Sequence, residues 1–135
     1  MFILSTPRFY SSQCVPGSGL QLTIMLLHQT DNYIRVCMNA WLLCEACIHT
    51  EQEKLSPKEK LLDACHRCSE ACLSIVSVFI SNPVTVRQHV FDCFLHCREC
   101  YNECMQYRED DIEYCGAVCD KCAETMKELM YFGLN

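Results

Sequence analysis

The sequence predicts an all-α protein, an antiparallel up-down-up-down four-helix bundle with a cysteine-lined core. Thirteen of the 14 cysteines fall between Cys37 and Cys122, nearly all three or four residues apart, a spacing that places side chains on one face of a helix. Glycine and proline are scarce, at four each. Start and stop signals divide the chain into four segments whose short connections favour antiparallel neighbours. No segment indicates β-structure.

The first helix is expected to begin at an Asp31 N-cap and to run to about Thr50. A backward extension through 22–29 is compatible with the pattern. We interpret residues 1–24 as an N-terminal extension and residues 25–135 as the cysteine-rich bundle, with Met25 as a candidate natural start.

The second helix has a strong start signal, with Ser56 as cap, Pro57 at the first helical position and Glu59 three residues after the cap. It should run to about Ile80, where Ser-Asn-Pro at 81–83 interrupts it. The third helix is expected to follow that proline and to end near residue 108.

The fourth helix should begin at Asp110, with Glu113 three residues later, and end at Gly133. On all four predicted helices the cysteines lie on the face expected to turn inward. The candidate metal ligands are Cys37, Cys44, Cys47, Cys65, Cys68, Cys72, Cys93, Cys97, Cys100, Cys104, Cys115, Cys119 and Cys122.

Antiparallel threading gathers these cysteines towards the end that carries the loops 51–56 and 109–110. The opposite end should be an apolar plug made of Ile75, Phe79, Val86, Val90, Met126 and Leu129. We therefore expect the sulfur column to open at the loop end, with Cys47, Cys104 and Cys115 nearest the opening.

Thiolates are soft ligands that prefer Cu(I) or Zn(II) to hard cations. The pairs 68/72, 93/97, 100/104 and 115/119 lie one helical turn apart, which suits near-linear Cu(I) or an ion shared with the next helix. A single core cysteine is usually a packing residue, but leucine or isoleucine would bury more apolar area at all thirteen positions. The pattern predicts a protein that binds several Cu(I) ions.

Two alternatives remain open from the residues alone: a zinc-binding structural protein, and a disulfide-stapled helical hairpin of an oxidising compartment, with a structural or chaperone-like role. The spacing does not fit an iron–sulfur cluster. No nucleophile–base pair or phosphate-binding loop is evident, so we do not expect an enzyme.

The net charge and the composition of the N-terminal segment limit which partners and which compartment we expect. The net charge of −6 argues against nucleic acid. Residues 1–27 lack the basic start and continuous apolar run of a signal peptide, and the apolar stretch 20–27 is too short to span a bilayer. We expect a cytoplasmic protein with reduced thiols and no membrane partner.

The cysteine motifs resemble those of the bacterial four-helix-bundle copper storage proteins, particularly their cytosolic branch. The resemblance covers roughly residues 31–130 and rests on the cysteines of 37–47, Cys-His-Arg-Cys-Ser-Glu-Ala-Cys at 65–72, and the cysteines of 93–104 and 115–122. It implies a homo-oligomer, a tetramer in the family, whose bundles each store many Cu(I) ions. We expect a copper chaperone or a small thiol to deliver the copper. Departures are Glu-Asp-Asp at 109–111 instead of a histidine-rich loop, and Ala40 and Trp41 at positions where further thiols are expected.

Several residues near the column are weaker candidates. His49, His66 and Met105 are possible accessory ligands, although a surface or packing role is the preferred interpretation for each. Cys14 lies outside the predicted bundle and has no assigned role.

Overall fold

The computed structural model describes residues 18–82 and 85–133, and within them it is helical, without a strand. The elements are α2 (Ser18–Gln52), α3 (Glu59–Ser81), α4 (Val86–Cys104), α5 (Asp110–Glu128) and the π-helical turn η2 (Leu129–Gly133). The chain divides into two compact units, Met1–Asp31 and Asn32–Asn135, and α2 runs through the division. The bundle considered below is the unit from Asn32 onward.

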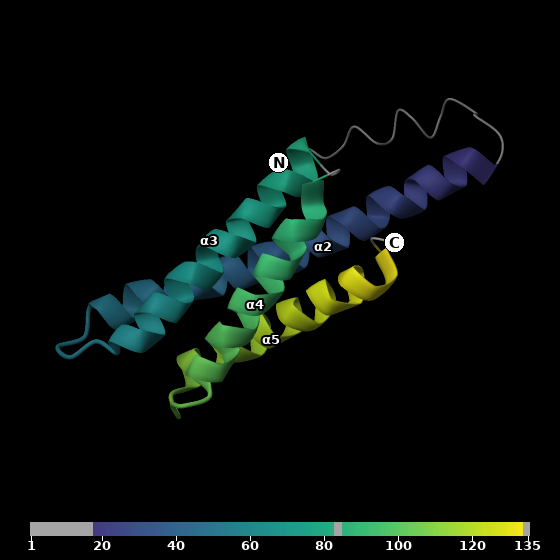
Figure 1. Ribbon diagram of the computed structural model, residues 1–135. Helices are drawn as coiled ribbons and strands as arrows, with labels where there is room; N and C mark the ends of the chain where they lie inside the picture. The colour runs from purple at the N-terminus through teal and green to yellow at the C-terminus, as the bar shows by residue number, and fades with distance from the viewer. Residues whose placement is uncertain (1–17, 83–84, 134–135) are drawn as a thin grey trace. The chain divides into compact units, whose positions relative to one another are not determined.

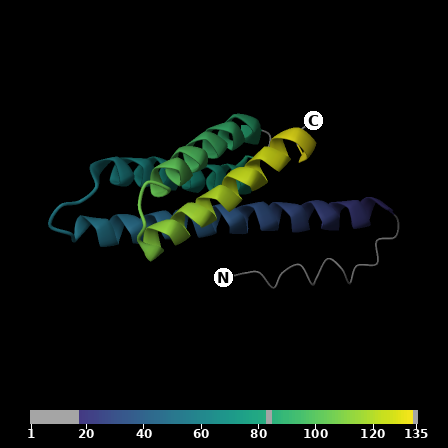
Figure 2. The same ribbon diagram turned by 90° about the horizontal axis from the view of Figure 1, so that it is seen from below.

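Sulfur contacts between α3 and α4 demonstrate the antiparallel arrangement. As residue numbers rise along α3, those of the contacting residues fall along α4. The pairs are Cys65 with Cys100, Cys68 with Cys97, and Cys72 with Cys93. Loops 53–58 and 105–109 meet at one end of the bundle, as Figures 1 and 2 both show. The predicted all-α bundle is confirmed.

Two helix starts differ from the sequence prediction. The Asp31 cap is wrong, because α2 begins at Ser18 and passes through Asp31 without interruption. No glycine or proline between Gly19 and Pro57 breaks this segment. The Ser56 cap is also wrong, because α3 begins at Glu59, with Lys58 as its N-cap residue.

The third helix is shorter at both ends than predicted. It begins at Val86, while residues 83 and 84 lie outside the described part of the chain. It ends at Cys104 instead of residue 108, because the backbone tightens there: Gln106 N–H donates to Glu103 O at 3.1 Å and Tyr107 N–H to Cys104 O at 3.2 Å. The fourth helix begins at Asp110 as predicted, although Glu109 is the N-cap residue.

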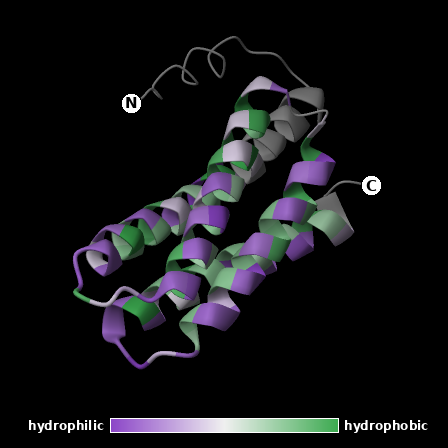
Figure 3. Ribbon diagram, turned by 60° about the vertical axis from the view of Figure 1, so that its left-hand side comes forward, coloured by the Kyte–Doolittle hydropathy of each residue, from purple (hydrophilic) through white to green (hydrophobic). Residues whose placement is uncertain are grey.

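The core of the bundle has a sulfur-rich part and an apolar part. Hydrophobic and hydrophilic residues alternate along the helices in Figure 3, as expected for amphipathic helices that bury one face. The predicted plug is confirmed, because its members are 0–4% exposed, apart from the half-buried Phe79, whose ring stacks on Tyr33. The buried members are Ile75, Val86, Val90, Met126 and Leu129.

Candidate metal centre

The thirteen predicted cysteines all lie in the core as free thiols. Three come from α2, three from α3, four from α4 and three from α5. Neighbouring Sγ atoms on different helices lie 3.5–4.0 Å apart, far beyond the roughly 2.05 Å of a disulfide bond. The sequence prediction that these side chains converge is therefore confirmed, whereas their role as ligands stays a proposal.

Ten of these cysteines form three tetrads, in each of which the four sulfurs lie within 4.8 Å of one another. Two of the tetrads share Cys44 and Cys100, so they are successive layers of one column. The tetrads are Cys44, Cys65, Cys100 and Cys115; Cys44, Cys68, Cys100 and Cys119; and Cys72, Cys93, Cys97 and Cys122.

The remaining three cysteines extend the column at both ends. The Sγ atom of Cys37 lies 3.9 Å from that of Cys122. Cys47 interacts with Cys65 and Cys115, and Cys104 interacts with Cys100 and Cys65. An ion bound anywhere along the column therefore has another thiol within reach.

Hydrogen bonds among the buried thiols shift their pKa values in both directions. Hydrogen bonds with Cys100 and other thiols, together with burial, raise the pKa of Cys44 far above its ordinary value, and the same causes act on Cys37. Hydrogen bonds with neighbouring thiols lower the pKa of four others, Cys68, Cys93, Cys115 and Cys122, the last to about 7 through Cys37 and Cys72. Since thiolate is the form that binds metal, loading must release protons.

A protein-family model described as copper storage protein matches residues 27–131. The chain belongs to the copper storage protein family. The match spans all thirteen core cysteines and the described part of α3, α4 and α5. Comparison with curated proteins and with solved structures finds no match.

In this copper storage protein, the candidate accessory ligands lie at the surface. The His49 side chain is 77% exposed and lies 3.4 Å from Glu53, and His66 is exposed. Met105 is 62% exposed. The surface interpretation of His49 and His66 is confirmed, whereas the packing role preferred for Met105 is wrong because its side chain is largely exposed, and Cys14 lies outside the described residues. No helix in the described ranges is long and apolar enough to cross a bilayer.

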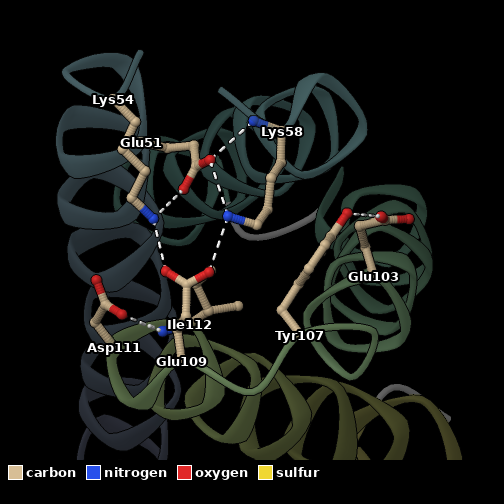
Figure 4. Close-up of polar contacts among 8 residues, drawn as sticks. All are labelled: Glu51, Lys54, Lys58, Glu103, Tyr107, Glu109, Asp111 and Ile112. Atoms are coloured by element: carbon tan, nitrogen blue, oxygen red, sulfur yellow. Dashed lines mark hydrogen bonds and ion pairs between the residues drawn. The ribbon is translucent and has the colours of Figure 1, made fainter. Parts of the chain in front are cut away.

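The loop end of this copper storage protein is covered, contrary to the expectation of an open column. Four side chains form a closed ring of alternating charge over it, which we call the ionic ring: Glu51, Lys54, Lys58 and Glu109 (Figure 4). Lys54 Nζ lies 2.9 Å from Glu51 and 2.7 Å from Glu109, and Lys58 Nζ lies 3.5 Å and 2.8 Å from the same carboxylates.

Glu51 is the central residue of the ionic ring. It is 1% exposed, and its Oε2 atom also accepts a hydrogen bond of 2.8 Å from the backbone N–H of Lys58. Burial raises the pKa of Glu51, but the hydrogen bonds from Lys54 and Lys58 outweigh burial and leave the pKa below its usual value. Hydrogen bonds from Lys54 and Lys58 also lower the pKa of Glu109, to about 2. Both carboxylates are therefore charged at neutral pH.

Sequence reasoning missed the ionic ring because the acidic run at 109–111 is fully accounted for, from sequence, by capping at the start of the fourth helix. One signal was available: Glu51 lies four residues after Cys47, in the same helical register as the inward-facing thiols. A carboxylate in a core register requires a partner. The partners of Glu51 are Lys54 and Lys58, which both come from the loop that follows α2.

Proposed function

We propose that this protein binds and stores several Cu(I) ions through thiolates of the thirteen core cysteines, and that it serves copper storage or detoxification. The observation that carries the proposal is the continuous column of free, buried thiols on four facing helices in a chain of the copper storage family. Thiolate is the side-chain ligand best matched to Cu(I). A column of shared ligands suits many ions better than one isolated site.

Zinc is the second candidate metal, because the sulfur separations within each tetrad suit a tetrahedral zinc site. A tetrahedral site with Zn–S bonds of about 2.3 Å has ligand sulfurs about 3.8 Å apart. In the tetrad of Cys44, Cys68, Cys100 and Cys119, four sulfur–sulfur separations of 3.6–4.0 Å include that value. Distance alone therefore does not distinguish a zinc protein from a copper store.

Charge balance favours Cu(I). Four thiolates around one Zn²⁺ leave a net charge of about −2, which is costly to bury without a counter-charge. Among the described residues, the buried polar or charged side chains are Glu51, Ser69 and Thr125, and none is a cation. One Cu⁺ per thiolate leaves the column neutral. On this argument full loading approaches one ion per thiol, or about thirteen ions.

The setting of the proposed function follows from the same chemistry. We propose a cytoplasmic location, because a reducing compartment keeps thirteen core thiols available for metal, and delivery of copper by a chaperone or a small thiol. A homo-oligomer of bundles, a tetramer by family resemblance, is part of the proposal. The column stores metal and supplies no nucleophile–base pair for catalysis.

Anaerobic titration of the reduced protein with Cu(I), against a competing chelator, tests the proposal. We expect tight binding of many equivalents, whereas saturation at one or two would refute storage. A parallel titration with Zn²⁺ should saturate at fewer ions; many zinc ions and little copper would favour the zinc alternative. Cys14→Ser is the matched control, because it removes a cysteine to which we assign no role, and it should leave the capacity unchanged.

Thiol counting on freshly isolated protein addresses the disulfide alternative. We expect almost all cysteines to react after anaerobic denaturation without added reductant. A largely oxidised core would instead support the disulfide-stapled protein and would move it to an oxidising compartment.

A further inference from the structure

The ionic ring ties together the segments at one end of the bundle. Glu51 belongs to the last turn of α2, Lys54 and Lys58 to the loop before α3, and Glu109 to the connection before α5. Tyr107 reinforces this arrangement, because its ring lies under Lys58 Nζ at 5.4 Å. Figure 4 shows the two lysine ammonium groups between the two carboxylates.

The ionic ring lies one helical turn outside the outermost thiols. Glu51 follows Cys47 by four residues on α2. Leu61 precedes Cys65 by four residues and Ile112 precedes Cys115 by three, and both apolar side chains are fully buried. A metal ion that approaches along the bundle axis from this end therefore meets the ionic ring before any sulfur.

The exposure of the thiols identifies this end as the accessible one. Cys47 is 6% exposed and Cys104 is 1% exposed, while the other eleven core thiols are 0% exposed. Both of these cysteines belong to the loop end. No core thiol near the plug has measurable exposure.

The two ends of the column differ in how readily they open. The plug is held by large, fully buried apolar side chains such as Ile75 and Met126, and moving them exposes apolar area to water. The ionic ring is held by ion pairs whose lysine side chains are 26–32% exposed and whose Glu109 is 42% exposed. Partly exposed pairs are individually weak, and water replaces them when they separate. The loop end also buries Leu61 and Ile112, but the ion pairs of Glu109 lie outside them and separate without exposing apolar area, so this end opens more readily than the plug.

We propose that the ionic ring of Glu51, Lys54, Lys58 and Glu109 is a gate over the sulfur column, and that Cys47 is the first thiol to receive copper when it opens. Opening separates Glu109 from the two lysines and uncovers Cys47. The Cys47 thiol then loses its proton to water as its sulfur takes Cu(I) from the donor. The ion passes on to Cys65 and Cys115, with which Cys47 interacts. The copper part of this inference rests on the proposed storage function.

Two matched variants test the gate. Glu109→Gln removes one carboxylate from the ionic ring and leaves Glu51 paired. Asp120→Asn is the control. The Asp120 side chain is 39% exposed and pairs with Arg98 of α4 at 2.6 Å, and neither residue belongs to the ionic ring. Both variants change the net charge by the same amount. Lys54→Gln opens the ring from its cationic side and provides a second variant if Glu109→Gln is unstable.

The first measurement needs no copper. Metal-free reduced protein is treated with iodoacetamide, and alkylation of Cys47 is followed by peptide mass spectrometry. We expect alkylation to be several-fold faster in Glu109→Gln than in wild type and unchanged in Asp120→Asn. Equal rates in wild type and both ring variants would overturn the gate, whatever the copper capacity.

The second measurement is the initial rate of anaerobic Cu(I) loading at fixed donor concentration. We expect Glu109→Gln to load several-fold faster, to the same final capacity. If the carboxylates of the ionic ring attracted the copper ion and did not block it, Glu109→Gln would load more slowly than wild type. The sign of the change in loading rate therefore distinguishes a gate from an attracting site. Faster alkylation without faster loading would overturn the route through Cys47. Saturation of wild type at one or two ions would refute the storage function, while the alkylation rates would still decide the gate.

Discussion

At the residue scale, the packing of the core depends on how closely neighbouring helices approach. Cysteine is smaller than leucine or isoleucine, so a cysteine-lined core brings the helices close together. Gly116 on α5 faces Cys104 on α4, and a Cβ atom added to Gly116 would lie 2.8 Å from the Cβ of Cys104. Real side chains do not adopt so short a contact, and a Cβ atom cannot rotate away from it. Glycine at 116 therefore sets the separation of α4 and α5 at the loop end.

We expect Gly116→Ala to destabilise the protein despite the higher helix propensity of alanine. Overpacking costs about 1–3 kcal/mol, whereas the propensity gain is at most about 1 kcal/mol. Urea unfolding of the reduced, metal-free protein measures the difference. Ala117→Ser, at the exposed neighbouring position, should change the stability by less than about 0.5 kcal/mol. An unchanged or higher stability of Gly116→Ala would show that the two helices separate freely.

At the element scale, distant side chains determine where the helices begin. The segment at 56–59 contains the signals of a capping box, yet α3 begins at Glu59 and the N–H of Lys58 is bound by the carboxylate of Glu51 from the end of α2. A buried carboxylate with three donors outcompetes a local serine hydroxyl, because charge-assisted hydrogen bonds are the stronger ones. The start of α3 is thus a tertiary feature.

Replacement of Glu51 should therefore destabilise the bundle. Glu51→Ala removes the carboxylate that accepts the hydrogen bond from the Lys58 N–H, which is also the buried member of the ionic ring. We expect a loss of about 1.5–3 kcal/mol in the free energy of unfolding. Glu53→Ala is the control, because the Glu53 side chain is 70% exposed and its contact is with His49, only four residues earlier; its effect should be below about 0.5 kcal/mol. Thermal unfolding followed by circular dichroism measures both. Equal effects would mean that the burial of Glu51 has no energetic consequence.

At the scale of the whole molecule, the sulfur column and the apolar plug form one core. Protonated cysteine packs as a small hydrophobic residue, so the column can be buried without metal, and the plug contributes larger apolar side chains. This differs from a zinc finger, in which the metal is required for folding. Under the proposed function, we expect the bundle to fold first and to load metal afterwards.

We predict that the metal-free, reduced protein is folded and that Cu(I) raises its melting temperature. Binding to the native state alone stabilises it by about 2.7 kcal/mol for one site at a free concentration of 100 Kd, and several sites add to this. Anaerobic circular dichroism of metal-free and loaded samples provides the measurement. An unfolded metal-free protein, or equal melting temperatures, would contradict the prediction.

The amino-acid sequence alone determined the helical class, the inward face of each helix and the composition of both parts of the core. These features are local, because a step of three or four residues places Cys65, Cys68 and Cys72 on one face whatever the helix packs against. The apolar residues at 75 and 126 continue the same faces. Burial of all thirteen candidate thiols follows from this periodicity.

Only the tertiary structure decided which thiols share a tetrad, where α3 begins and how the loop end is closed. Cys44 and Cys100 belong to two tetrads because of the register between α2 and α4, and no spacing within a helix encodes that register. The ionic ring joins Glu51 to Glu109 through Lys54 and Lys58. Those two carboxylates are far apart in the sequence and close only after the helices pack. Local patterns determine which face is buried, and the packing of the helices determines which side chains meet.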